Sequence, residues 1–363
     1  MAVKRIEGAI DINNNSFDII RVLCTYIVFF GHFITHFEVD SPGLFFVAYF
    51  VRAVPVFFLF SGFFTSASIE KYTTKEFYIR RFFRIYPAMW ICIIINTIII
   101  IITYSSFPSF KDFVIYLSSQ FTVGQFYTGS WLRGYGVGVP NGALWTISSD
   151  IQFYIIAILI AKIMKNKSLK VWLITVGSFA LVSLGIGQCE AFIPAILYKI
   201  IMVVIVPYMY IFLFGMMVYY HKDKIIPFLA NKWILISCLY IGWSLMPSHI
   251  TQYFQGVRYN VITTLLLMCL VIALGYAFGK HRVKNDYTYG FYLYHMVVIN
   301  FIYHMFIKKI DQPWIFISLL IISSVVIFIM GFISQKYVDE KLSRRLQKKV
   351  LNRINKKENM ELQ

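Results

Sequence analysis

The sequence predicts an all-α membrane protein, a polytopic transmembrane helical bundle of about ten helices. Hydrophobic residues make up 59% of the 363 residues and charged residues only 14%, which is not the composition of an ordinary soluble domain. Apolar stretches of about 20 residues, long enough to cross a hydrocarbon core of roughly 30 Å, recur along almost the whole chain. Because these stretches show no alternation of polar and apolar residues, helices are predicted in place of barrel strands.

The expected spans have soft boundaries, and the seventh is short. They cover residues 17–37, 44–66, 86–104, 143–164, 170–186, 194–220, 232–246, 259–279, 288–307 and 314–335. No soluble domain or internal repeat is apparent, so residues 1–340 are expected to form one membrane domain, followed by a basic tail over 341–363.

Orientation follows from the positions of the basic residues, since cytoplasmic loops retain Lys and Arg. With the N-terminus inside, 25 of the 34 Lys and Arg fall in inner segments and five in outer loops. Both termini are therefore predicted to be cytoplasmic. The net charge of +17 is mostly this topology signal, the tail is expected to lie on anionic lipid headgroups, and nucleic acid binding is the weaker interpretation.

The first apolar stretch contains two ionisable residues, Arg21 and His32. Such side chains within a span usually face a bundle interior or a wet cavity and mark a pathway or reaction centre. The stretch has a polar lead and no small-residue cleavage site, so it is expected to be an uncleaved signal anchor. Arg21 is predicted near the inner end of this helix and His32 near its outer end, from a rise of about 1.5 Å per residue.

The second and fourth spans place Arg52 and Asp150 at a depth similar to that of His32. A histidine that can carry a proton, an acid and a guanidinium in one layer predict an acceptor pocket that opens outward. The alternative is a buried ion pair between Arg52 and Asp150 that only fixes helix packing.

The third span is preceded by Arg80, Arg81 and Arg84. Spacings of three and four residues place Arg80 or Arg81 on the same helical face as Arg84. Guanidinium groups suit bidentate binding of phosphates, so a phosphate-bearing donor on the cytoplasmic side is predicted. The alternative is that topology alone explains these charges. His295, seven residues into the ninth span, is expected at the same inner level.

The long outer segment, residues 105–142, is rich in glycine and aromatic residues, among them Trp131. Flat rings can stack on sugar faces and glycine permits close backbone approach, so the segment is predicted to be a lid over an acceptor. The alternative is an interfacial aromatic belt on a flexible linker. The five cysteines form no close pair, so neither a metal site nor a disulfide framework is indicated.

Five motifs in this order resemble the acyltransferase-3 family of integral membrane acyltransferases, which O-acetylate surface sugars in bacteria. Arg21 and His32 are separated by ten residues. The other four stretches are VFFLFSGF at 56–63, RFFRIYP at 81–87, LWTISSDIQFY at 144–154 and YGFYLYH at 289–295. The resemblance runs through most of the chain.

The resemblance implies transfer of an acyl group, most often acetyl, from cytoplasmic acyl-coenzyme A to a hydroxyl of a surface glycan or its lipid-linked precursor. It implies His32 as general base, with Arg21 and Asp150 completing the catalytic group. Donor contacts are expected from Arg80, Arg81, Arg84 and His295, and acceptor contacts from Arg52, Trp131, Trp145 and Tyr154. No metal cofactor is expected, and the bacterial cytoplasmic membrane is the implied location.

Three positions depart from the family pattern. Ile151 stands where a second acidic residue is frequent. Asp150 stands where Glu is common, so its shorter side chain needs a closer backbone or a bridging water. Gly290 stands where Ser is usual.

Two other classes of protein are also considered. A transporter or flippase of a glycolipid would fit ten spans with buried charges, although no inverted repeat is visible. A catalytically silent assembly partner is disfavoured by the retained motifs. The sequence leaves the oligomeric state open, a homo-oligomer included.

Overall fold

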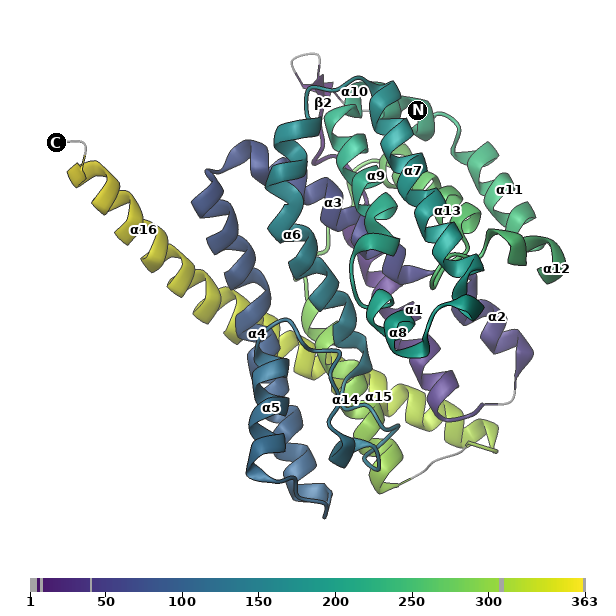
Figure 1. The fold of residues 1–363 in the computed structure, drawn as a ribbon, viewed down its shortest axis with the longest axis vertical. Helices are drawn as coiled ribbons and strands as arrows, with labels where there is room; N and C mark the ends of the chain where they lie inside the picture. The colour runs from purple at the N-terminus through teal and green to yellow at the C-terminus, as the bar shows by residue number, and fades with distance from the viewer. Residues whose placement is uncertain (1–4, 7–8, 40, 307–309, 362–363) are drawn as a thin grey trace. The chain divides into compact units, whose positions relative to one another are not determined.

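A computed structural model describes residues 5–6, 9–39, 41–306 and 310–361, and it is mainly helical (Figure 1). The prediction of an all-α polytopic bundle is confirmed. A short antiparallel pair, β1 (Arg5–Ile6) with β2 (Ala9–Ile10), precedes the first helix. Lys4, Lys308 and Lys309, which contribute to the charge asymmetry, lie outside the described residues.

The chain divides into two compact units, each built from three separate segments. The first unit contains Met1–Ile27, Tyr49–Lys71 and Ser149–Lys284, and the second contains Val28–Ala48, Tyr72–Ser148 and Asn285–Gln363. Two helices pass from one unit to the other, α1 (Phe17–His36) and α6 (Trp145–Met164).

The first unit contains most of α6 and eight further helices. These are α3 (Ala53–Lys71), α7 (Leu169–Gln188), α8 (Ala195–Ile201), α9 (Met209–Tyr220), α10 (Lys222–Ala230), α11 (Trp233–Ser244), α12 (Ser248–Thr251) and α13 (Val261–Ala277), with short 3-10 turns η3 (Glu190–Phe192), η4 (Val206–Tyr208) and η5 (Gln252–Phe254).

Helices α3 and α9 cross closely because each presents a glycine to the other. A Cβ on Gly62 would lie 2.1 Å from the Phe212 carbonyl oxygen, and one on Gly215 would lie 2.2 Å from the Leu59 carbonyl oxygen. Small residues permit this backbone approach in membrane bundles. The glycine of the 56–63 motif therefore has a packing role.

The second unit is built around α4 (Thr74–Thr103) and α14 (Thr288–Met305). It also holds most of α2 (Pro42–Phe50), α5 (Phe110–Phe121), the turns η1 (Ser130–Leu132) and η2 (Gly142–Leu144), α15 (Pro313–Ile333), the π-helix η6 (Ser334–Ser343) and α16 (Arg344–Glu361). Thr73 and Glu76 form a capping box that satisfies backbone N–H groups at the start of α4.

A second glycine crossing joins α14 to α15 and explains one departure from the family pattern. A Cβ on Gly290 would lie 2.8 Å from the Gly331 carbonyl oxygen, and one on Gly331 would lie 2.7 Å from the Phe291 nitrogen. The serine that is usual at position 290 would be forced against backbone atoms. Glycine permits the helices to meet at this point.

The described residues contain six helices long and apolar enough to cross a membrane, or eight if each bent pair is one span, compared with the ten expected. The bent pairs are α8 with η4 and α9 (50°), and α10 with α11 (73°). Helix α13 is short, and α14 carries buried polar side chains that a lipid-facing helix would not tolerate.

The expected second span matches one candidate span, Pro42–Lys71, and Arg52 lies within it. Val51 and Arg52 form a local break between α2 and α3, so Arg52 is not itself in helical conformation. The expected boundary between the membrane domain and the tail, after residue 340, falls inside η6. That domain boundary stays a prediction.

Candidate active site

Helix α14 positions His295 in the interior of the second unit, where the residue is only 1% exposed. Its ring Nδ1 lies 2.6 Å from the Tyr292 carbonyl oxygen. Because a carbonyl oxygen only accepts, Nδ1 carries the hydrogen, and the neutral imidazole then has its lone pair on Nε2. Nε2 is buried and has no hydrogen-bond partner among the described residues.

Three imidazole rings gather at this position. The His32 ring centroid lies 5.3 Å from that of His295, at an interplanar angle of 34°. His36, one helical turn beyond His32, stacks on it at 5.5 Å with an angle of 4°. We call His32, His36 and His295 the histidine cluster.

The expectation that His295 lies at an inner level, away from His32, is therefore wrong. A rise of about 1.5 Å per residue gives the position of a side chain along its own helix only if the helix crosses the membrane upright. Helix α14 is not among the six candidate spans of the described residues. The two rings are neighbours, and His295 belongs with the proposed catalytic group by position. A donor-binding role for His295 stays a prediction.

Side chains from the start of α6 fix the backbone that holds His295. The Tyr292 hydroxyl lies 2.7 Å from the Thr146 hydroxyl and donates to the Ala143 carbonyl oxygen at 3.0 Å. Tyr292 in turn supplies the carbonyl that orients the imidazole. Motif 144–154 thus reaches motif 289–295 through Thr146, and Trp145 lies beside this contact, half-buried at the first turn of α6.

The outer segment 105–142 is a folded part of the second unit. It contains α5, and Tyr116, Leu132 and Tyr135 form a buried cluster with Ile100 of α4. Burial raises the pKa of the Tyr116 phenol to about 12 and raises that of Tyr135. The interpretation of this segment as a flexible linker is therefore wrong.

Asn300, fully buried on α14, anchors the end of this segment. Its Oδ1 accepts from the Val137 backbone N–H at 2.9 Å, and its Nδ2 donates to the Val139 and Pro140 carbonyl oxygens at 3.1 and 3.0 Å. Gly136 has φ +54°, and a Cβ there would lie 2.1 Å from Asn300 Oδ1. Asn141 adds a bond to the Leu293 carbonyl oxygen at 2.9 Å.

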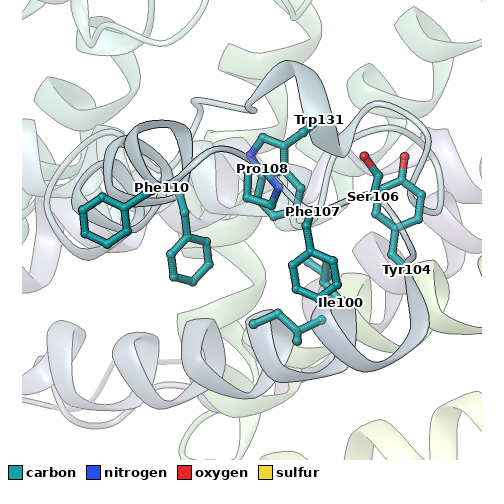
Figure 2. Close-up of a pocket in the computed structure, with 9 residues that line it drawn as sticks. Ile100, Tyr104, Ser106, Phe107, Pro108, Phe110 and Trp131 are labelled. Carbon is teal, nitrogen blue, oxygen red and sulfur yellow. The ribbon is translucent and has the colours of Figure 1, made fainter.

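Trp131 lies in the wall of a pocket of about 340 Å³ at the end of α4 (Figure 2). The lining is largely aromatic and aliphatic and is formed by Ile100, Ile101, Tyr104, Ser106, Phe107, Pro108, Phe110, Phe113 and Trp131. The Trp131 ring packs edge-on against Tyr116 at 5.6 Å. Its Nε1 is buried and has no hydrogen-bond partner among the described residues, and a Cβ on Gly129 would lie 2.7 Å from it.

The three arginines before Pro87 each lie against an aromatic ring. Arg80 lies 3.8 Å from the Tyr72 ring centroid, Arg81 lies 5.4 Å from that of Phe77 and Arg84 lies 5.6 Å from that of Tyr289. Cation–π contacts of this kind hold guanidinium groups in place.

Arg84 also bonds to Asp286 at 3.4 Å. Both side chains are substantially exposed, so this ion pair contributes little to stability.

The remaining predicted residues belong to the first unit. Arg21 lies 4.0 Å from Asp18 and 5.8 Å from the Phe64 ring centroid. Tyr154 accepts a long hydrogen bond from Ser61 at 3.4 Å. Asp150 is half-buried in the second turn of α6, and Arg52 is exposed ahead of α3. A meeting of Arg21, Arg52 or Asp150 with His32, which belongs to the second unit, stays a prediction.

Sequence reasoning missed His36, Tyr292 and Asn300. His36 had a usable signal, because residues four apart lie on one face of a helix and His32 was already singled out. Asn300 also had one, since an amide inside an apolar stretch needs buried partners. Tyr292 also had one, because it lies within the 289–295 motif, although the motif does not say which of its aromatic side chains forms the contact with Thr146.

Comparisons with known proteins follow this geometry. A family model described as an acyltransferase domain matches residues 14–332. The chain is 22% identical over 312 residues to Nodulation protein 10 of Rhizobium leguminosarum bv. viciae, and this match covers 79% of the chain and 83% of the relative. No solved structure matches the chain. No group of three or more His, Cys, Asp or Glu that could hold a metal occurs in the described part of the chain.

Proposed function

The chain belongs to the acyltransferase-3 family of membrane acyltransferases, and from that premise we propose that it transfers an acyl group from acyl-coenzyme A to a hydroxyl of a surface glycan or of its lipid-linked precursor. Acetyl is the proposed group, because it is the one the family most often uses. The proposed location is the bacterial cytoplasmic membrane, with both termini in the cytoplasm.

The histidine cluster is the observation that carries this proposal. Acyl transfer from a thioester needs a base that takes the proton of the attacking hydroxyl. An imidazole has a proton affinity suited to this step near neutral pH. His32 from α1 and His295 from α14 provide two such groups in ring contact, and a buried Nε2 of His295 carries an available lone pair.

The reaction proceeds in one displacement in this proposal. The acceptor oxygen attacks the thioester carbonyl, the carbon–oxygen bond forms and the carbon–sulfur bond breaks. His32 takes the hydroxyl proton, which then passes to the departing coenzyme A thiolate. His36 and His295 hold the His32 ring by ring contacts. Direct transfer is the simpler scheme, because sequence motifs indicate no activated Ser or Cys beside His32.

Binding of the acyl-coenzyme A donor is assigned to the two arginines of the 81–87 motif and to Arg80, which precedes them. Arg80, Arg81 and Arg84 would bind coenzyme A phosphates, and their aromatic partners preorganise the guanidinium groups. Arg21 and Asp150 are proposed to complete the catalytic group around His32.

For acceptor binding we propose the aromatic pocket of the second unit and, separately, three residues expected from the sequence. The pocket beside Trp131 has largely aromatic and aliphatic walls, which suit the apolar face of a sugar or the hydrocarbon part of a lipid carrier. Arg52, Trp145 and Tyr154 are proposed as further acceptor contacts.

A transporter function has no comparable support. Broken helices at matched positions in two halves would favour it. Both bent helix pairs belong to the first unit and follow one another directly in the sequence. They are not a matched pair from two halves.

Mass spectrometry of surface glycans tests this function. We expect an alkali-labile, acetyl-sized addition in cells that express the intact protein and none in cells with the vector alone. A His249→Ala variant, changed at an exposed histidine of α12, is the matched control and should still modify the glycan. If a host that makes the acceptor expresses the intact protein and its glycans still carry no addition, the proposal is contradicted.

A further inference from the structure

Helix η6 is an unusual element of the second unit. It is a π-helix of ten residues that joins α15 to α16 and packs against α4 and α14. π-Helices are rare, occur mostly as single turns and are frequent at functional sites. A π-helix of this length therefore calls for a functional explanation.

One face of η6 carries three buried polar side chains. Ser334, Asp339 and Ser343 are 2%, 9% and 4% exposed, and their spacings of five and four residues are close to one turn of a helix with i→i+5 hydrogen bonds. In the described part of the chain, Ser334 Oγ, Asp339 Oδ2 and Ser343 Oγ have no hydrogen-bond partner. Buried polar groups without partners are costly, and a carboxylate is costlier than a hydroxyl. Three on one face indicate a ligand.

The surroundings of Asp339 connect this face to the arginine cluster. Arg84, Asp286, Glu340 and Arg344 all interact electrostatically with the Asp339 carboxyl. Arg84 is one of the three residues proposed for phosphate binding. Acceptor oxygens on η6 thus neighbour a guanidinium group that suits phosphate.

The position of η6 also decides which part of the donor could reach it. A Cβ on Gly290 would lie 3.1 Å from the Ser334 Cβ, so η6 begins beside α14 five residues before His295 and continues along α4 to α16. The thioester must react at His32. The part of the donor that lies on η6 is therefore its remote end, beyond the phosphates.

We propose that Ser334, Asp339 and Ser343 form a subsite for the nucleoside end of a coenzyme A donor. The carboxylate accepts a hydrogen bond from the ribose 2′-hydroxyl or from the adenine amino group, and the two serines complete the polar contacts. A phosphate in direct contact with Asp339 is disfavoured by like charge. The proposal rests on the proposed acyl-coenzyme A function and adds a residue set outside the family motifs.

Binding of adenosine 3′,5′-bisphosphate to the purified full-length protein in detergent tests the subsite. Asp339→Asn retains the size of the side chain, and we expect it to weaken binding about tenfold or more, as for loss of a hydrogen bond to a charged group. Ser343→Ala is a second variant and should weaken binding severalfold. Glu340→Gln removes the same charge one residue away, from a half-buried side chain whose Oε1 accepts a hydrogen bond from Gln335 that a Gln oxygen can also accept, and should bind as the intact protein does.

Kinetics with two donors separate this inference from the proposed function. Asp339→Asn should raise the KM for acetyl-coenzyme A about tenfold and leave the KM for acetyl-pantetheine, which lacks the nucleotide, unchanged. Equal changes with both donors, or nucleotide binding equal to that of the intact protein, would overturn the subsite while acyl transfer stands. An intact protein that uses neither thioester would instead refute the proposed function.

Discussion

Replacement of Asn300 by Asp tests how the outer segment is held. The change preserves shape but removes the amide group that donates to the Val139 and Pro140 carbonyl oxygens and to that of Met296 in the same helix, and it places oxygen against them. The side chain is fully buried, so water cannot readily replace the lost partners. At about 1 to 2 kcal/mol for each of the two contacts with the segment, the segment should lose roughly 2 to 4 kcal/mol against local opening.

Hydrogen exchange followed by mass spectrometry measures this opening directly. Because about 1.4 kcal/mol is a factor of ten in an equilibrium, exchange in peptides covering residues 133–142 should accelerate about 30-fold to about 1,000-fold. Asn231→Asp, at an exposed turn after α10, is the control and should leave these peptides unchanged. Exchange within about threefold of the intact protein in Asn300→Asp would refute the anchoring role.

Three further predictions concern the histidine cluster and its support. His36→Ala should slow acyl transfer about 2-fold to 10-fold through loss of ring packing on His32, while His36→Phe retains most of the rate; equal losses in both would indicate that the imidazole itself is needed. Tyr292→Phe should lower kcat about tenfold, because the hydroxyl that holds the α14 backbone to Thr146 is lost; an unchanged kcat would reject that link. Gly290→Ser should lower the thermal unfolding temperature, because a Cβ there meets the Gly331 backbone at 2.8 Å. Gly242→Ser, at a position with open space around it, should not lower it. Equal effects of the two changes would contradict the close packing of α14 on α15.

Hydropathy predicted the fold class because a segment in lipid must hydrogen-bond all its backbone N–H and C=O groups internally, and a helix does so. The differences arise where protein, not lipid, surrounds a segment. Helix α14 is an example: it tolerates His295 and Asn300 because the second unit buries them. Helix α5 was missed as a helix, although Ser109 and Asp112 provide a capping signal at its start.

The site could be predicted in parts but not assembled. Motif spacing identified His32 and His295, yet their contact depends on how α1 and α14 pack, which depth arithmetic does not give. The anchoring of the outer segment by Asn300 depends on a positive φ at Gly136 and on backbone groups of Val137, Val139 and Pro140, which are far from Asn300 in the sequence. The π-helix had no sequence signal, since its polar residues fit an ordinary α-helix equally well.

Label transfer in isolated membranes tests the central claim, that His32 acts as the base in acyl transfer. Membranes supply the native acceptor, and radiolabelled acetyl-coenzyme A supplies the donor. His32→Ala should lower incorporation of label into glycan about 100-fold to 10,000-fold, the range for a lost general base, while His249→Ala incorporates label as the intact protein does. Incorporation by His32→Ala at the rate of the intact protein, at matched expression, would contradict the account.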